Sequence, residues 1–84
     1  MKYRFVYTQR ALRDIKKLDE NVKQRIGKTL MRYLDAPLDY AESLTDSSLG
    51  SYRFRAGDYR IIFDIEGRDI VVLRVGHRRE LYKR

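Results

Sequence analysis

The strongest constraint on the fold is an alternation of apolar and charged residues in the C-terminal half of the chain. Residues 52–55 alternate aromatic side chains with arginines, and residues 59–66 largely resume the alternation after a break at 56–58. Successive side chains of a β-strand point to opposite faces of a sheet, so the pattern predicts two strands with one apolar and one polar face. Gly57, in the break, tolerates the positive φ of a tight turn, which predicts an antiparallel hairpin.

Other periodic segments predict a third and a fourth strand with two helices. Aromatic residues at every second position predict a strand over residues 2–7, and residues 70–75 have the nearly continuous apolar character of a central strand. Between these strands, apolar residues at three- and four-residue spacing predict two amphipathic helices, the first capped by Thr8 and the second ending near Asp35. Residues 37–50 have no sustained period and are interpreted as an irregular surface connection.

The resulting order, β-α-α-β-β-β, predicts an α+β fold in which a helix hairpin packs on one face of a small, twisted, mainly antiparallel sheet. A chain of 84 residues buries enough surface for one core but not for two, so residues 1–84 are expected to form a single domain. The chain has no run of eighteen apolar residues and no apolar stretch after its first charges, so we expect a cytoplasmic protein without a membrane span or signal peptide. With no cysteine and one histidine, no metal site or cofactor is expected.

The charge of the chain is strongly positive and unevenly distributed. Nineteen Lys and Arg residues against twelve Asp and Glu residues give a net charge of +7. The basic residues fall in the first 32 and the last 32 residues, whereas residues 33–52 carry four acidic side chains and no basic one. Such a balance attracts polyanions, so nucleic acid or an acidic protein segment is the expected partner.

The hairpin is expected to carry a patch of arginines on the face that points away from the helices. The candidates for this patch are Arg53, Arg55 and Arg60 on the hairpin, Arg74, which has the parity of Ile70 and Val72, and Arg79 just after the last strand. A guanidinium donates paired hydrogen bonds to phosphate and keeps its proton, so the patch is suited to binding a phosphodiester and the extra charge of its transition state. The alternative interpretation is a solvated face on which these arginines pair with Asp64 or Glu66.

Two further side chains are candidates for chemistry near the C-terminal end. His77 is the only histidine, and histidine is the side chain that ordinarily exchanges a proton near neutrality, so it is a candidate general base or acid. Tyr82 offers a phenolic proton or a ring on which an unpaired base stacks. The alternatives are a surface histidine after a strand and an aromatic anchor for the end of the chain.

Two motifs resemble the RelE branch of the RelE/ParE toxin superfamily. They are Ser51-Tyr-Arg-Phe-Arg-Ala-Gly-Asp-Tyr-Arg-Ile-Ile-Phe63 and Val75-Gly-His-Arg-Arg-Glu-Leu-Tyr82. The resemblance implies a toxin of a type II toxin–antitoxin system that cleaves messenger RNA in the ribosomal A site without a metal, by attack of a ribose 2′-hydroxyl on the adjacent phosphate. It also implies that Arg53 and Arg55 fill basic positions, that Arg60 and Arg78 bind phosphate, and that Tyr82 is the C-terminal tyrosine of the family site.

The chain departs from the family pattern in ways that affect the chemistry. Relatives with lysine at the Arg53 or Arg55 position can use it as a base, whereas arginine is too strongly basic for that role. Proton transfer is therefore expected to fall to His77 or to a ribosomal RNA group, with Tyr82 stacking or assisting. Compared with longer relatives, the chain is also expected to lack a C-terminal helix.

The resemblance further implies partners and two rival functions. The expected partners are an acidic antitoxin that folds on binding, the ribosome with its message, and operator DNA only through the toxin–antitoxin complex; no membrane is involved. One rival is a ParE-like toxin that binds DNA gyrase instead of cutting RNA, which would not need the arginines at positions 53, 55, 60 and 78. The other rival is a nucleic-acid-binding module without catalysis.

Overall fold

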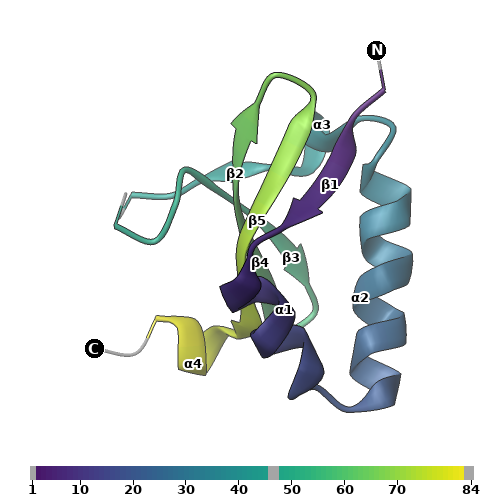
Figure 1. Ribbon diagram of the computed structural model, residues 1–84, viewed down its shortest axis with the longest axis vertical. Coiled ribbons are helices and arrows are strands. Elements are labelled where there is room, and N and C mark those ends of the chain that lie inside the picture. The colour runs from purple at the N-terminus through teal and green to yellow at the C-terminus, as the bar shows by residue number, and fades with distance from the viewer. Residues whose placement is uncertain (1, 46–47, 83–84) are drawn as a thin grey trace.

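The computed structural model describes residues 2–45 and 48–82, which form a five-stranded mixed sheet with two helices packed on one face (Figure 1). In chain order the elements are β1 (Arg4–Tyr7), α1 (Gln9–Lys16), α2 (Glu20–Tyr33), α3 (Pro37–Tyr40), β2 (Glu42–Ser43), β3 (Tyr52–Ala56), β4 (Tyr59–Glu66), β5 (Asp69–His77) and α4 (Arg78–Leu81). The expected α+β fold is confirmed, and the β-α-α-β-β-β order holds once the short elements α3, β2 and α4 are added. Positions 46 and 47 of the predicted surface connection lie outside the described residues.

The strands are ordered β1-β5-β4-β3-β2, and only β1 pairs in parallel, with β5. Antiparallel neighbours need only tight turns. The predicted turn at Gly57 is confirmed, with φ of 63°, and Gly67 has φ of 61° at the turn between β4 and β5. The parallel pair instead needs a crossover, and α1 and α2 supply it. The topology thus brings the N-terminal strand beside the strand that ends at the C-terminal motif.

The core lies between the sheet and the two longer helices, as the alternation predicts. Phe54, Ile61 and Phe63 are fully buried under Ile26 and Leu30 of α2. Burial of aromatic and branched side chains of this size is the main stabilising contribution in a fold without disulfides. None of the described helices is long and apolar enough to cross a membrane.

The segment interpreted as an irregular connection contains two short elements that lack any periodicity. Pro37 starts α3, where its missing N–H would have no helical partner in any case. The strand β2 then pairs with β3 so that Glu42 lies opposite Arg53. Beyond β2, Gly50 approaches the sheet closely, because a Cβ atom there would lie 2.7 Å from a side-chain carbon of Ile62. The expectation of a wholly irregular segment is therefore wrong, and the segment covers part of the sheet face opposite the helices.

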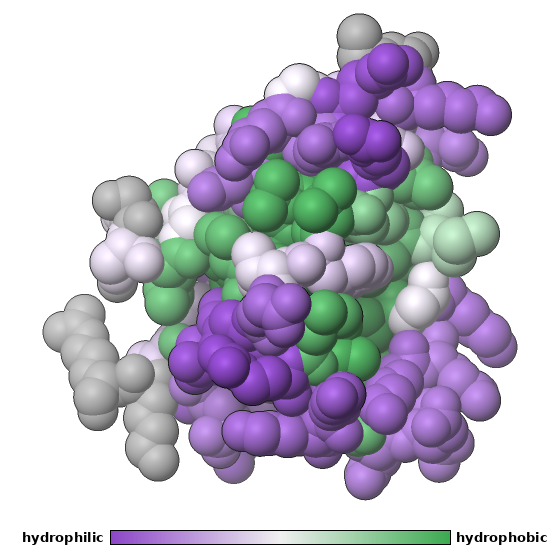
Figure 2. All heavy atoms as spheres, in the orientation of Figure 1, coloured by the Kyte–Doolittle hydropathy of each residue, from purple (hydrophilic) through white to green (hydrophobic). Residues whose placement is uncertain are grey.

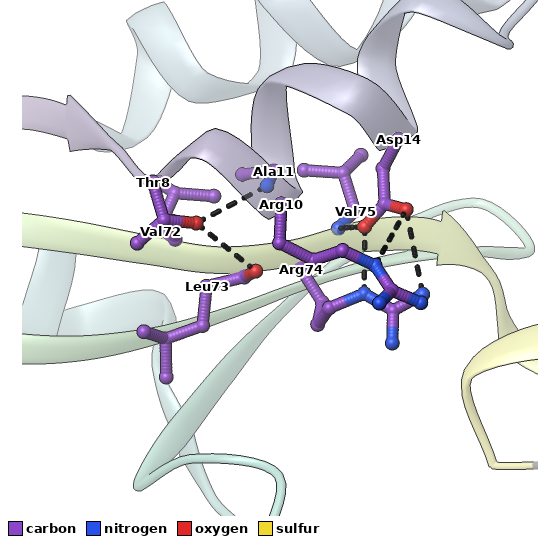
Figure 3. Close-up of polar contacts among 8 residues, drawn as sticks. All are labelled: Thr8, Arg10, Ala11, Asp14, Val72, Leu73, Arg74 and Val75. Carbon is purple, nitrogen blue, oxygen red and sulfur yellow. Dashed lines mark hydrogen bonds and ion pairs between the residues drawn. The ribbon is translucent and has the colours of Figure 1, made fainter.

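A bulge in β5 and a carboxylate on α1 set the position of the C-terminal motif. Between β4 and β5 the pairing shifts, so that Arg74 lies opposite Ile62 instead of keeping the parity of the buried positions before it. Asp14 of α1 accepts hydrogen bonds from Arg74 Nε at 2.7 Å and from the Val75 N–H at 3.0 Å (Figure 3). Thr8 caps α1 as predicted and donates to the Val72 carbonyl. These contacts fasten α1 to β5 where the strand is irregular.

The strand β5 continues to His77, and the next four residues form α4. The expectation that no helix follows the last strand is therefore wrong. A single turn has no hydrophobic period to detect, and its position depends on contacts with distant parts of the chain. Figure 1 shows α4 beside the end of the sheet where the β3–β4 turn lies.

The face of the molecule that shows β1, β5 and α1 has an apolar centre. Figure 2 shows this area in green, with hydrophilic side chains above and below it. Val6 and Leu12 are among the exposed large apolar residues of the chain. Leu12 was expected on the buried side of α1, and its exposure means that the buried stripe of this helix is narrower than the spacing predicts.

Candidate functional site

Four arginines gather on the sheet face opposite the helices, and we call them the arginine cluster: Arg53, Arg55, Arg60 and Arg78. The pairing of β3 with β4 places Arg55 directly opposite Arg60. Arg53 lies two residues before Arg55 and therefore on the same face, while Arg78 opens α4. The charges of the other three arginines all act on Arg60, which makes it the centre of the cluster.

Arg60 differs from the others because its side chain is almost entirely buried, with 6% of the residue exposed. Its Nη1 donates to the carbonyls of Gly57 and Tyr59 at 2.7 and 2.9 Å, and its buried Nε has no hydrogen-bond partner among the described residues. Burial lowers the pKa of Arg60, and the charges of Arg55, Arg53 and Arg78 lower it further, while Tyr82 acts in the opposite direction. A cation held among like charges is under-neutralised, so an anion placed beside it is favoured.

One carboxylate, Glu42 of β2, lies within the arginine cluster. Its Oε1 accepts from Arg53 Nε at 2.9 Å and from Arg55 Nε at 2.8 Å. The hydrogen bonds and charges of these two arginines outweigh desolvation and lower the pKa of Glu42 below its usual value. Glu42 thus contacts two of the four guanidinium groups, Arg53 and Arg55, and the cluster keeps an excess of positive charge.

Tyr82 closes the cluster from the C-terminal side. Its hydroxyl accepts from Arg53 Nη1 at 3.0 Å, and the Arg53 guanidinium lies 5.9 Å from the centre of its ring. The hydrogen bond from Arg53 to Tyr82 is the largest cause of a raised Arg53 pKa. A tyrosine held by an arginine presents both a hydroxyl and an aromatic face to whatever occupies the cluster.

Arg78 and Arg79 differ in their contacts. The Arg78 N–H donates to the Asp58 carbonyl at 2.9 Å, which attaches α4 to the β3–β4 turn, and its guanidinium lies only at the limit of ion pairing, 4.0 Å from the Asp58 carboxylate. Arg79 is exposed, and its side chain makes no hydrogen bond or ion pair with residues 2–45 or 48–82. Both guanidinium groups therefore remain available to an anionic ligand.

Arg74 does not belong to the cluster. Asp14 accepts hydrogen bonds from Arg74 Nε and Nη2. Arg74 is also not among the charges that shift the pKa of Arg60. The bulge places Arg74 opposite Ile62 and so on the sheet face of Arg60, but the expectation that it joins the other arginines is wrong, because the nearly buried carboxylate of Asp14 binds it.

His77 lies on the other face of the sheet. Arg60 pairs with Gly76, whereas His77 pairs with Tyr59, whose ring it meets edge-on with centroids 5.4 Å apart. Its Nδ1 accepts a hydrogen bond from the Arg79 N–H at 3.1 Å. Within the described part of the chain, His77 makes no hydrogen bond or ion pair with the arginine cluster. The structure thus brings Tyr82 to the arginines but separates His77 from them.

Sequence reasoning missed two carboxylates that organise this region, Glu42 and Asp14. Both lie far along the chain from the arginines they bind, and neither belongs to a recognisable motif. The acidic composition of residues 33–52 was the only signal for Glu42, since an acidic segment in a basic chain is expected to contact the basic part, and nothing in the sequence pointed to Asp14. The expected pairing of arginines with Asp64 or Glu66 is not seen; Asp64 accepts the Ser51 N–H instead.

The arrangement favours the binding of a phosphate and the stabilisation of charge that develops on it. Guanidinium groups from β3, β4 and α4 converge beside a carboxylate that can accept a proton and a phenol that can donate one. No group of three or more His, Asp or Glu side chains among the described residues is arranged to hold a metal ion.

Comparisons with known proteins agree with this geometry. A family model described as the ParE toxin of the type II toxin–antitoxin system parDE matches residues 5–82. Toxin RelG of Mycobacterium tuberculosis is 31% identical over 87 residues, which cover 100% of both chains. The toxin–antitoxin complex RelBE2 from M. tuberculosis contains a similar structure, with a TM-score of 0.80, 26% identity, and coverage of 92% of this chain and 99% of that one. A mutant of E. coli toxin RelE in the free state is also similar, with a TM-score of 0.71, 25% identity, and coverage of 98% and 92%.

Proposed function

The chain belongs to the ParE toxin family of type II toxin–antitoxin systems, within the RelE/ParE superfamily, and we propose that it is a toxin that cleaves messenger RNA on the ribosome. The observation that carries the proposal is the arginine cluster, in which a buried Arg60 is surrounded by three further guanidinium groups. A protein that only binds another protein does not need three like charges held around a buried cation.

The proposed reaction is transfer of the scissile phosphate to the neighbouring ribose 2′-hydroxyl. The 2′-oxygen forms a bond to phosphorus as the bond to the 5′-oxygen breaks, which leaves a 2′,3′-cyclic phosphate and a 5′-hydroxyl. In this proposal Arg60 and Arg78 bind the phosphate and stabilise the additional negative charge of the transition state, with Arg55 at its side. Removing one such donor typically lowers a catalytic rate by about 10²–10³.

The reaction also needs a group that takes the 2′-hydroxyl proton and a group that protonates the leaving oxygen. Glu42 is assigned the first role on position, because its Oε2 accepts no hydrogen bond from the described residues. Arg53 and Arg55 lower its pKa, which keeps it ionised but makes it a weaker base than a free carboxylate. Tyr82 is suited to the second role, because its hydroxyl lies beside Arg53. These assignments replace the expectation that His77 transfers the proton, since its ring contacts Tyr59 on the other face.

The proposed partners follow from the same charges and from the relatives. The similar M. tuberculosis structure is a complex with an antitoxin, and an acidic segment would be attracted to a chain of net charge +7. We propose that such an antitoxin binds this chain in the cytoplasm, that the ribosome and its message are the target, and that operator DNA is reached only through the complex. Arg79 is available to add to RNA binding.

Primer extension on messages bound to translating ribosomes tests the proposal, run beside a DNA gyrase supercoiling assay. We expect breaks within A-site codons, none when the A-site nucleotides carry 2′-deoxyribose, and unchanged gyrase activity. Intact messages with inhibited gyrase would instead favour the ParE-like rival that the name of the matching family suggests. Intact messages with active gyrase and retained RNA binding would leave a nucleic-acid-binding module.

A further inference from the structure

Three contacts attach the single turn α4 to the end of the sheet. The Arg78 N–H donates to the Asp58 carbonyl, and the buried Leu81 packs so closely on Gly76 that a Cβ atom there would lie 3.3 Å from it. The third contact is the hydrogen bond from the Arg79 N–H to His77 Nδ1. A one-turn helix is unstable by itself, so these contacts determine whether α4 forms.

The role of α4 is to carry two groups of the site. Arg78 is its first residue, and Tyr82, directly after it, donates its N–H to the Arg78 carbonyl and accepts a hydrogen bond from Arg53. If the turn unwinds, the Tyr82 hydroxyl and the Arg78 guanidinium lose their fixed positions beside Arg53 and Arg60. The geometry of the arginine cluster therefore depends on the N-terminal end of α4.

The N-terminal end of α4 is capped by the His77 imidazole. His77 has extended backbone angles, φ −65° and ψ 141°, as an N-cap residue does, and its side chain satisfies an N–H that has no partner within the turn. The capping nitrogen must be unprotonated to accept this hydrogen bond. The ring faces Tyr59, and charged side chains from the neighbouring elements line the pocket beside it: Asp14 of α1, Lys17 directly after α1, Arg74 of β5 and Glu80 of α4.

We infer that His77 is a positioning residue, which caps α4 and thereby holds Arg78 and Tyr82 at the arginine cluster, and that it does not exchange a proton with the RNA. The predicted effects on the cleavage rate rest on the proposed function, whereas the capping of α4 by His77 does not. It accounts for a histidine that lies in the C-terminal motif although, among the described residues, its side chain makes no hydrogen bond or ion pair with the arginine cluster.

Three substitutions separate a capping role from a catalytic one. Asparagine caps helices well through its Oδ1 and has no proton to exchange near neutrality, whereas alanine and glutamine are poor caps. We expect His77→Asn to cleave A-site message within about twofold of the wild type, and His77→Ala and His77→Gln to cleave about fivefold more slowly, as the typical cost of a lost cap predicts. A loss of about 100-fold or more in His77→Asn, as for removal of a general base, would overturn the inference.

The dependence of the rate on pH provides a second kinetic readout. Protonation of the wild-type imidazole removes the hydrogen-bond acceptor, so cleavage by the wild type should decline as the imidazole becomes charged. The His77→Asn variant should lack that decline while it retains its rate at neutral pH. A variant that keeps the same acidic decline would show that another group causes it and would contradict the capping role.

Nitrogen-15 NMR of the imidazole tests the inference independently of activity, because the chain has one histidine and its ring signals need no further assignment. We expect the tautomer with hydrogen on Nε2 and an unprotonated, hydrogen-bonded Nδ1. We also expect the chemical shift of the Arg79 amide to change in His77→Ala, because that amide loses its hydrogen-bond acceptor. A ring with hydrogen on Nδ1 would overturn the inference while leaving the proposed nuclease intact. If the spectra are as expected but the protein cleaves no message, the proposed function is overturned and the capping role of His77 stands.

Discussion

Replacing Glu42 by glutamine is expected to strengthen RNA binding and to slow cleavage. The carboxylate is 44% exposed and its partner Arg55 is 55% exposed, so their ion pair contributes only about 0–1 kcal/mol to the fold. The uncharged amide adds one net positive charge to the arginine cluster. Two charges about 4 Å apart in a water-like medium interact by about 1 kcal/mol, which corresponds to RNA binding that is about fivefold tighter. The logarithmic salt dependence of binding should steepen by about 0.7, the value for one more neutralised phosphate of a single strand.

Cleavage by the Glu42→Gln variant should change in the opposite direction. A general base typically contributes about 10²–10⁴ to a rate, and an amide cannot take up the 2′-hydroxyl proton. We therefore expect the single-turnover rate on A-site message to fall by about 100-fold or more although the RNA is bound more tightly. If Glu42 only competes with the RNA phosphate for Arg53 and Arg55, the Glu42→Gln variant should instead cleave faster than the wild type.

Fluorescence anisotropy and single-turnover cleavage measure the two effects separately. Anisotropy with a 2′-deoxy analogue at several salt concentrations gives binding without reaction, and programmed ribosomes give the rate. Glu66→Gln is the matched control, because it removes the same charge at the exposed far end of β4 and should change neither quantity by more than about twofold. A Glu42→Gln variant that cleaves as fast as the wild type would refute the role of Glu42 as proton acceptor.

Substitutions at two further residues, Asp14 and Tyr82, test other contacts. Asp14→Ala should lower the free energy of unfolding in urea by about 2–4 kcal/mol, because it leaves the Arg74 guanidinium and the Val75 N–H without their nearly buried acceptor. Burial opposes the charged form of Asp14, but its hydrogen bonds and the nearby arginines outweigh this effect and lower its pKa. The stability that Asp14 contributes should therefore be complete above about pH 3.9, the ordinary pKa of Asp in the unfolded chain. It should be lost as the pH falls through the lower pKa of Asp14 in the folded protein. Tyr82→Phe should cleave about 100-fold more slowly or worse, since it loses the hydroxyl proposed to protonate the leaving oxygen but keeps a ring for stacking. Tyr82→Ala should lose more, by about 1–3 kcal/mol of base stacking, and equal rates in the two Tyr82 variants would exclude a role for the ring.

The parts of the fold that could be predicted from sequence are those with local periodicity. The alternation in β3 and β4 and the spacing in the two long helices repeat over enough residues to identify each element and its buried face. Helix α3, strand β2 and helix α4 are too short for any period, and contacts with distant segments stabilise them. The pairing of Glu42 with Arg53, for example, depends on a two-residue strand that forms only against β3.

The same distinction explains which of the candidate residues lie together as the sequence predicts. Arg53, Arg55 and Arg60 come together because strand parity holds within a regular hairpin. Parity alone does not decide the place of Arg74: a bulge in β5 puts it on the face of Arg60, but Asp14, distant in sequence, binds its guanidinium. His77 lies one residue beyond Gly76, the partner of Arg60, so its ring points to the other face although the motif places it beside Arg78 in sequence.

The central claim, that the arginine cluster stabilises a phosphate during RNA cleavage, is tested most directly by the single-turnover rate of Arg78→Ala on programmed ribosomes. Arg78 is exposed and its ion pair is at the limit of contact, so its removal should leave the fold intact. The matched control is Arg68→Ala, which removes an exposed arginine at the β4–β5 turn. We predict a rate about 10²–10³ lower for Arg78→Ala and a rate within about twofold of the wild type for Arg68→Ala. Equal rates for the two variants would contradict the claim.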